Sequence, residues 1–357
     1  MSRKLVLASC FLLATIASGM YSRGDSPPAA AAIDAATVAK VIDAAIQKLD
    51  EQYVFPDVAK RMGEDLRQRQ KNGDYAQIRS GADLAVTLTK QLQEISKDKH
   101  LRVRFNPDNA NSAPAKGGPT KEMIAQFRRD SAIRNAGFRK VERLPGNVGY
   151  IAFDVFSDKE FIGRPMAAAM SFLANTDALI IDLRKNGGGS PLGVQVVCSY
   201  LFPAEPSVHL NSLYFRPDDR TDDFWTLKEL PAPRFVDKPV FVLTSSRTFS
   251  GAEECAYNLQ TRKRATIVGE TTGGGAHPGG SVPLTDHFTM FVPRGRAINP
   301  VTKTNWEGVG VIPEVSVAAD QALDAAHKLA IEKVLANAND ETRRLIQADL
   351  DRAKDSR

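Results

Sequence analysis

The first third of the chain carries the hydrophobic pattern of helices. Apolar residues recur there at spacings of three and four, which places one apolar stripe on each predicted helix. The first helix is stopped by Pro56, the second ends near Gly73, and the third begins at a capping box that starts with Ser80. An alternating segment at residues 100–105 then predicts a strand. We therefore expect a helical cap domain over residues 33–105.

The pattern changes after a segment rich in Asn, Pro, Ala and Gly at residues 106–119, which predicts a linker. Beyond it, nearly continuous apolar runs alternate with helical segments, the pattern of a buried sheet flanked by helices. The predicted strands are residues 138–144, 148–156, 178–183, 239–243, 265–268 and 288–292. The sequence thus predicts an α/β fold, with one core domain at residues 120–318 and an amphipathic helical tail at residues 319–357.

The N-terminus has the features of an export signal. Arg3 and Lys4 precede an apolar stretch at residues 5–16, which is shorter than the ~20 residues that span a bilayer. Small residues, Ala17 and Gly19, follow at the spacing of a signal-peptidase site. We expect residues 1–22 to be a signal peptide, the mature chain to be periplasmic or secreted, and no segment to span a membrane.

Composition and charge narrow the classes of function. The 357 residues are 43% hydrophobic and 25% charged, which excludes a collagen, a coiled coil and a wholly disordered chain. The 47 basic and 42 acidic residues are spread along the chain without a basic run, so nucleic-acid binding is not expected. Since no His, Cys and Asp residues stand at metal-ligand spacing, we predict neither a metal nor another cofactor. The sequence is compatible with either free or paired thiols at Cys198 and Cys255.

One strand-to-helix turn offers a candidate nucleophile. Ser250 follows the buried strand at residues 239–243 and begins the next helix, where free backbone N–H groups attract negative charge. Gly251 has no side chain to obstruct a substrate carbonyl, and its N–H is a candidate oxyanion-hole donor. Ser250 and Glu253 also have the spacing of a capping box, and from this segment alone capping is the favoured interpretation.

A second turn, at residues 184–189, follows the predicted strand at residues 178–183. Ligands of open α/β sheets bind at this end of the strands. Three glycines allow close approach of a peptide and positive φ values, so Gly187 or Gly188 is the candidate for the second oxyanion donor. The sequence after the glycines lacks the Lys-Ser/Thr of a phosphate-binding loop. A purely structural turn is an equally good interpretation of this segment alone.

A nucleophilic serine requires a general base, and two of the five histidines are candidates. His100 lies at the junction between the third cap helix and its strand, a position where an imidazole is more often structural but can also face a cleft. His277 lies on a glycine-rich loop and is the reserve candidate. Glu307 is a carboxylate among apolar and glycine residues, which makes it the candidate to orient the base.

Seven segments follow one another along the chain as recognisable motifs, at residues 53–56, 98–101, 149–151, 182–189, 248–253, 269–274 and 306–311. Together they resemble the tail-specific, or C-terminal processing, serine protease family. The resemblance is greatest to the branch that contains interphotoreceptor retinoid-binding protein domains and the tricorn protease core. Each motif alone is only weakly specific for the family, whereas the order and spacing of all seven over residues 37–318 are specific for it. The resemblance implies a crotonase-like ββα core that contains a mixed sheet.

The resemblance also implies roles for individual residues. It implies that Ser250 is the nucleophile and that Gly251, with Gly187 or Gly188, donates the oxyanion hydrogen bonds. It also implies that His100 is the general base and that Glu307 is the acid that orients it. Residues 272–280 contain no lysine, which disfavours the Ser/Lys dyad of the family's other branch, and the short linker leaves no room for that branch's PDZ domain. Lys99 stands where a tricorn-type site has a serine that links the acid to the base.

Two functions are therefore expected. The first is a secreted or periplasmic serine endopeptidase that cleaves peptides or unfolded proteins through an acyl-enzyme. The alternative is a non-catalytic binding module that uses the same fold for an apolar ligand, such as a retinoid or fatty acid, or for a peptide. The combination of Ser250, His100 and Glu307 favours the peptidase. A third function, that of a crotonase-like acyl-CoA enzyme, is less expected because such an enzyme would not need the serine and histidine pair.

Overall fold

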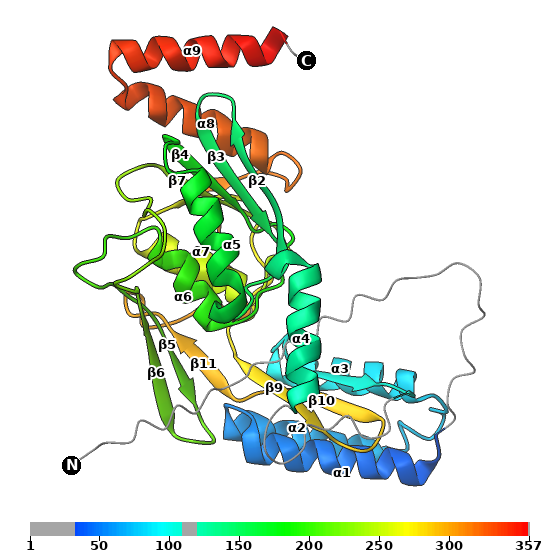
Figure 1. Ribbon diagram of the computed structural model, residues 1–357. Helices are drawn as coiled ribbons and strands as arrows, with labels where there is room; N and C mark the ends of the chain where they lie inside the picture. The colour runs from blue at the N-terminus through cyan, green and yellow to red at the C-terminus, as the bar shows by residue number, and fades with distance from the viewer. Residues whose placement is uncertain (1–32, 109–119, 356–357) are drawn as a thin grey trace, which may run out of the picture. The chain divides into compact units, whose positions relative to one another are not determined.

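The computed structural model describes residues 33–108 and 120–355, so the predicted signal peptide and most of the predicted linker lie outside the described residues (Figure 1). The chain forms two compact units. The first comprises Met1–Ile124 and Gly279–Arg294, and the second comprises Ala125–Pro278 and Gly295–Arg357. A segment from late in the sequence therefore belongs to the first unit, whereas the sequence predicted contiguous domains.

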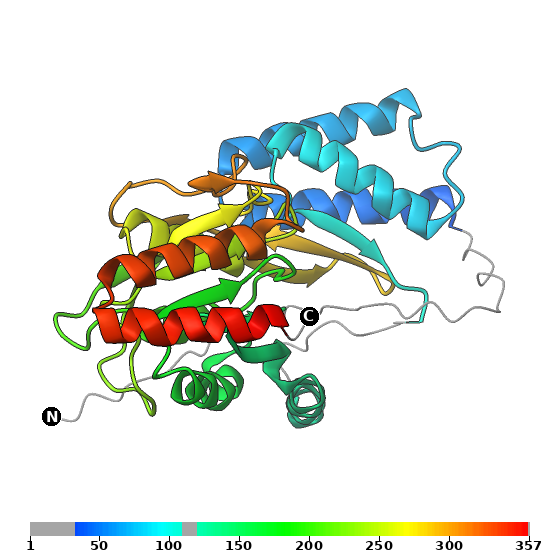
Figure 2. The same cartoon turned by 90° about the horizontal axis from the view of Figure 1, so that it is seen from above.

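The helices of the first unit are those expected from the apolar stripes. They are α1 (Ala35–Gln52), α2 (Pro56–Asn72) and α3 (Gly81–Ser96), which lie beside one another (Figure 2). Gly73 ends α2 with a φ of 80°, and the Ser80 side chain accepts a hydrogen bond from an amide in the first turn of α3. The buried faces of the three helices form one hydrophobic core. The predicted cap helices and the signals at their ends are thus confirmed.

The first unit also contains an antiparallel sheet in the order β1-β10-β9. Its strands are β1 (Arg102–Phe105), β10 (Phe288–Pro293) and β9 (Gly279–Pro283). The predicted strand at residues 288–292 exists, but its assignment to the core sheet is wrong, because β10 pairs with β1 and its residue Met290 is buried against the cap helices. A local apolar pattern does not specify which distant strand becomes the partner.

The second unit is built on a mixed six-stranded sheet in the order β12-β8-β7-β4-β3-β2. Its strands are β2 (Phe138–Leu144), β3 (Val148–Phe153), β4 (Ala178–Asp182), β7 (Val240–Thr244), β8 (Thr266–Gly269) and β12 (Val315–Ser316). Only β2 and β3 pair antiparallel, and the other neighbours are parallel. Every residue of β4 and β7 is buried, as expected for central strands covered on both faces. The predicted α/β class is confirmed.

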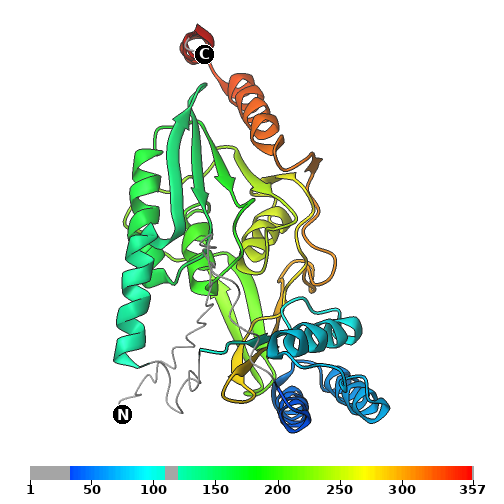
Figure 3. The same ribbon diagram turned by 90° about the vertical axis from the view of Figure 1, so that its right-hand side faces the viewer.

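Helices cover both faces of this sheet (Figure 3). On one face lie α5 (Lys159–Phe172), α6 (Pro191–Ser199) and α7 (Gly251–Thr261), and on the other lies α8 (Ala322–Asn337). Since α6 follows β4 and α7 follows β7, both helices begin at the carboxyl ends of the two central strands. Cys198 of α6 and Cys255 of α7 are free, buried thiols whose Sγ atoms are 3.7 Å apart.

Three further strands form a small antiparallel sheet that the sequence did not predict. In the order β11-β5-β6, they are β11 (Gly295–Ile298), β5 (His209–Phe215) and β6 (Arg220–Trp225). Polar residues such as Asn211 and Asp222 interrupt the apolar pattern of β5 and β6, which explains why no strand was expected.

The tail, which the sequence predicted to be helical, consists of two helices. After α8, the chain is extended at Ala338 and then forms α9 (Asp340–Asp355), which lies next to α8 in Figure 2. Asp349 of α9 accepts two hydrogen bonds from Arg143, at 2.9 and 3.0 Å, and this arginine lowers the pKa of Asp349 to about 2. The helix α4 (Lys121–Ile133) precedes β2, and within the described residues no helix is both long and apolar enough to cross a membrane.

Candidate active site

Ser250 stands in a strained turn between β7 and α7, here called the serine turn (residues 245–250). It has a φ of 55° and a ψ of −123°, which residues with a side chain rarely adopt. An ordinary N-cap residue has an extended conformation with negative φ, so capping alone does not require this backbone. Strain of this kind amounts to roughly 1–3 kcal/mol and is typical of functional sites. The turn presents the half-buried serine at the start of a helix, as nucleophilic serines on strand-turn-helix units are presented.

The serine turn is hydrogen bonded to the turn that follows β4, here called the glycine turn (residues 183–190). Thr248 Oγ1 donates to the carbonyl oxygen of Leu183 at 2.8 Å. The Phe249 amide donates to the carbonyl oxygen of Asn186 at 3.2 Å. Because β4 and β7 are neighbours in the sheet, these bonds join two adjacent strand ends into one surface.

The glycine turn is shaped from inside by the fully buried side chain of Asn186. Its amide group donates to the Phe153 carbonyl oxygen at 2.9 Å, and its side-chain oxygen accepts the Gly188 amide, also at 2.9 Å. Gly188 has a φ of 98°, and a Cβ there would lie 2.7 Å from the Gly251 nitrogen and 2.8 Å from Ser250 Cβ. A side chain is therefore excluded at Gly188, because the serine turn packs directly against it.

The predicted oxyanion donors differ in whether their amides are already engaged. The Gly187 amide donates to the Asp154 carbonyl oxygen at 3.2 Å, and the Gly188 amide is held by the turn's asparagine. Among the described residues, the amides of Gly251 and Gly189 donate to no protein acceptor. The Gly189 nitrogen lies 3.1 Å from the point where a Cβ on Gly251 would stand. Gly251, the first residue of α7, and Gly189 of the glycine turn thus each have an amide that no protein acceptor in the described part of the chain occupies.

Glu253, in the first turn of α7, is completely buried and accepts four hydrogen bonds. The donors are Ser250 N at 2.8 Å, Gly275 N at 2.8 Å, Gly274 N at 2.6 Å and Thr272 Oγ1 at 2.5 Å. Burial raises the pKa of Glu253, and these donors oppose the effect because they favour the carboxylate. The carboxylate connects the serine turn with residues 271–278, which we call the His277 loop.

The His277 loop brings the reserve base and the predicted orienting acid together. His277 Nδ1 lies 3.4 Å from Glu307 Oε2, and both side chains are largely buried. The same carboxylate oxygen accepts the Ala276 amide at 2.5 Å. Trp306 Nε1 donates to the Gly275 carbonyl oxygen at 2.8 Å, which fixes the segment before Glu307 to this loop. Ser250, Gly251, Glu307 and His277 all belong to the second unit.

His100, the predicted base, belongs to the first unit and lies just before β1. Its Nδ1 atom is 4.0 Å from Oδ1 of the fully buried Asp98, and its ring stacks on Phe291 with a centroid separation of 5.8 Å. Tyr53 donates its hydroxyl to the other Asp98 oxygen at 3.3 Å. The imidazole therefore lies beside an acid and an aromatic ring of its own unit.

Sequence reasoning missed the roles of two buried side chains in the second unit. Glu253 was noticed only as a capping residue, because three of its four donors come from residues far along the chain. Asn186 was part of a motif without a role of its own. Its only signal in the sequence is a polar residue directly before three glycines.

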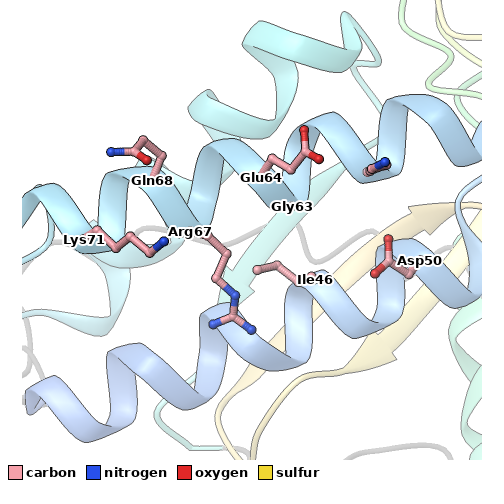
Figure 4. A pocket seen from close by; sticks show the side chains of 8 residues that line it. Ile46, Asp50, Gly63, Glu64, Arg67, Gln68 and Lys71 are labelled. Carbon is pink, nitrogen blue, oxygen red and sulfur yellow. The ribbon is translucent and has the colours of Figure 1, made fainter.

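The first unit has a separate surface hollow between α1 and α2, with a volume of about 440 Å³ (Figure 4). Its lining mixes acidic and basic side chains with one apolar residue and a glycine. It consists of Ile46, Asp50, Lys60, Gly63, Glu64, Arg67, Gln68 and Lys71. None of the predicted site residues is among them, so this hollow is not part of the candidate active site.

Among curated proteins, the chain is similar to processing proteases. It is 25% identical over 193 residues to a carboxy-terminal-processing protease of Bartonella bacilliformis, a match covering 52% of this chain and 42% of that protein. It is 26% identical over 206 residues to carboxyl-terminal-processing peptidase 2, chloroplastic, of Arabidopsis thaliana, covering 56% of this chain and 38% of the relative. The matched region thus spans less than half the length of each relative.

Solved structures show the same fold. A putative peptidase from Parabacteroides merdae aligns with a TM-score of 0.57 and 19% identity, covering 85% of this chain and 99% of that one. The photosystem II D1 C-terminal processing protease aligns with a TM-score of 0.51 and 16% identity, covering 81% and 94%. At these identities the likeness concerns the fold alone.

Two family models match successive parts of the chain. Residues 34–136 match the model described as the N-terminal domain of peptidase S41 in eukaryotic IRBP, and residues 147–317 match the model described as peptidase family S41. The second match contains the serine turn, the glycine turn and the His277 loop. With its IRBP-type N-terminal domain, the chain belongs to peptidase family S41.

Proposed function

We propose that the protein is a serine peptidase whose nucleophile is Ser250 Oγ. The observation that carries this proposal is the strained backbone of Ser250 at the start of α7, with φ 55° and ψ −123°. A residue that only caps a helix gains nothing from this strain. A nucleophile gains a fixed position beside amides that can bind developing negative charge. Membership of peptidase family S41 supports the same reaction class.

In the proposed reaction, Ser250 Oγ attacks the carbonyl carbon of a peptide bond while a histidine base takes the hydroxyl proton. The base gives this proton to the leaving amine as the C–N bond breaks, and an ester remains on Ser250. Water then attacks the ester carbonyl and gives a proton to the base, which returns it to Ser250 Oγ as the C–O bond breaks. The products are a carboxylic acid, an amine and the regenerated hydroxyl.

The oxyanion of each tetrahedral intermediate is proposed to bind the Gly251 amide and one amide of the glycine turn. The sequence pointed to Gly187 or Gly188 for the second donor, but both of their amides are hydrogen bonded within the protein. Within the described ranges the Gly189 amide is not engaged in this way, which supports Gly189 as the second donor. For Gly187 or Gly188 to donate, the glycine turn would have to shift and release its amide. Loss of one such donor costs about 2.7–4 kcal/mol of transition-state stabilisation in known cases.

The base is proposed to be His100, with Glu307 as the acid that orients it, because both match the tricorn-like branch of the resemblance. This assignment requires a histidine of the first unit to serve a serine of the second. The rival base is His277, which the 3.4 Å separation from Glu307 favours. The two assignments predict different results for single histidine variants.

The test uses a fluorophosphonate probe, which forms a bond between Ser Oγ and phosphorus as fluoride leaves, together with hydrolysis of unfolded casein. We expect Ser250→Ala to lose both reactions, and casein cleavage at the parent rate by this variant would refute the nucleophile. A loss of more than ~1,000-fold in His100→Ala but not in His277→Ala identifies His100 as the base. The reverse pattern identifies His277.

The alternative function is an apolar-ligand or peptide-binding module on the same fold. The same samples decide between the two functions. A parent protein that neither reacts with the probe nor cleaves casein, but retains a retinoid or fatty acid at micromolar concentration, is a binding module.

The substrates are proposed to be peptides or unfolded proteins that reach the protein outside the cytoplasm. The relatives' names describe proteases that process carboxyl termini, and residues 1–22 have the pattern of an export signal. We expect the mature protein in the periplasmic or secreted fraction, with an N-terminus near residue 23. Recovery of the uncleaved chain in the cytoplasm would contradict export.

A further inference from the structure

We propose that Glu253 is a positioning residue for the Ser250 site, whose carboxylate holds the serine turn and the His277 loop in a fixed relation. This inference rests on the proposed role of Ser250. Glu253 itself is completely buried, so it does not touch a substrate. It acts through the segments that it binds.

The two carboxylate oxygens of Glu253 accept hydrogen bonds from different pairs of donors. Oε2 accepts both the Ser250 amide and the Gly275 amide, each at 2.8 Å, so a single atom bridges the serine turn and the His277 loop. Oε1 accepts the Gly274 amide at 2.6 Å and Thr272 Oγ1 at 2.5 Å. Three of the four donors thus come from the loop. A capping box uses only the N-cap amide and leaves these three unexplained.

The Ser250 bond acts on the strained residue itself. Its amide belongs to the peptide unit that sets the unusual φ of 55°. Strained conformations persist only where the surroundings enforce them. A charge-assisted bond from a backbone N–H to a buried carboxylate is roughly twice as strong as a neutral one, which makes Glu253 a cause of the serine geometry.

Hydrogen bonds also join the His277 loop to the segment that carries Glu307. Thr272 Oγ1, besides donating to Glu253, accepts the Val311 amide at 2.7 Å. The Gly274 carbonyl oxygen accepts the Gly308 amide at 3.1 Å. The segment that carries Glu307 is therefore fastened on both sides to the loop that Glu253 holds. Moving the carboxylate would move the acid and His277 relative to Ser250.

Glu253→Gln tests the inference with almost no change in shape. The glutamine amide group replaces one acceptor oxygen by a donor, which would face two of the N–H or O–H donors already present. We expect kcat to fall by about 100-fold or more with KM changed less than about threefold, because a misplaced nucleophile slows the chemical step. The first-order rate of fluorophosphonate labelling should fall by the same factor.

Glu254→Gln is the matched control. Glu254 is the next residue of α7 and is also buried, but the side chains that act on its carboxyl group are those of Asn211 and Asn258 rather than those of either turn. We expect its kcat and KM to stay within about threefold of the parent values. Equal losses in both variants would show that any change in this buried helix slows the reaction, and would overturn the assignment to Glu253.

A second pair of variants covers the case in which Glu253→Gln does not fold. Thr272→Val keeps the volume but removes one donor to the carboxylate and the acceptor of the Val311 amide. We expect kcat to fall by about tenfold. Thr272→Ser retains the hydroxyl and should restore kcat to within about threefold of the parent.

The outcomes separate this inference from the proposed function. Labelling of the parent that Ser250→Ala abolishes establishes the nucleophile independently of Glu253. Given that result, a folded Glu253→Gln with parent kcat, or a Thr272→Val with parent kcat, overturns the positioning role. A rise in KM with unchanged kcat also overturns it, because that pattern belongs to substrate binding. A parent protein that is never labelled at Ser250 removes the proposed function, and this inference with it.

Discussion

The serine turn and the glycine turn end neighbouring strands of one sheet, yet they obtain their shapes in opposite ways. Ser250 keeps a side chain in a backbone conformation that disfavours one, with a φ of 55°. Gly188 and Gly189, at φ 98° and 138°, have no side chain, and the structure has no room for one. The comparison teaches that strain is retained where the proposed function needs a side chain and is avoided where it needs only the backbone.

Gly188→Ala is expected to have the largest effect on this arrangement. The new Cβ would lie 2.7 Å from both the Gly251 nitrogen and the Phe249 carbonyl oxygen, at a φ that disfavours alanine. Overpacking together with the positive φ should lower the free energy of unfolding by roughly 2–5 kcal/mol. Urea denaturation measures this change. Gly187→Ala is the control, because its Cβ meets no atom within 4 Å, and equal losses in both variants would contradict the packing argument.

Asn186→Ala should have the next largest effect, since it removes the side chain that holds the glycine turn from inside. It leaves the Phe153 carbonyl oxygen and the Gly188 amide without their 2.9 Å partners in a buried place. Buried groups left unsatisfied cost about 1–3 kcal/mol each. Because the costs of two groups in one network do not simply add, we expect a loss of roughly 2–4 kcal/mol in urea denaturation. Asn186→Asp keeps the acceptor for Gly188 but also buries a charge, and a parent-like stability for either variant would refute this account.

The sequence predicted both turns but not what connects them. Continuous apolar runs identified β4 and β7, and the residues after them identified Ser250 and the glycines, because these signals are local. The assembly of β1 with β10, and of Glu253 with Thr272 and Gly274, depends on contacts between residues far apart in the chain. No periodicity records such contacts. The roles of His100 and Glu307 came from the resemblance, and they remain predictions.

Helix α7, which begins after the serine turn, carries two buried glutamates in succession. Glu253 accepts four hydrogen bonds, and its neighbour Glu254 allows a test by pH. Burial raises the pKa of Glu254 to about 8 from an ordinary value of 4.5. The folded protein therefore holds a proton that the unfolded chain releases between these pH values. Through this group, stability is greatest below pH 4.5 and falls as the pH rises through 8, by at most about 1.4 kcal/mol per pH unit.

Glu254→Gln removes this dependence, because the amide resembles the protonated carboxyl and does not titrate. We expect the parent to lose more stability than the variant between pH 5 and pH 8 in urea denaturation. All other titrating groups are common to both proteins, so the difference between the two curves isolates Glu254. Curves that run parallel across this range would contradict a proton held by Glu254 in the folded state.

The smallest expected effect returns to the strained serine itself. Ser250→Ala and Ser250→Gly both lack the hydroxyl, so both should be inactive, but only glycine relieves the backbone at a φ of 55°. We expect the glycine variant to be more stable than the alanine variant by about 1 kcal/mol in urea denaturation, although glycine is normally the less stable of the two because its unfolded chain is more flexible. The reversed order, with alanine more stable, would mean that Ser250 is not strained and that the contrast between the two turns is one of packing alone. The expected order would show that the protein sacrifices stability at the one position where the proposed reaction needs a hydroxyl.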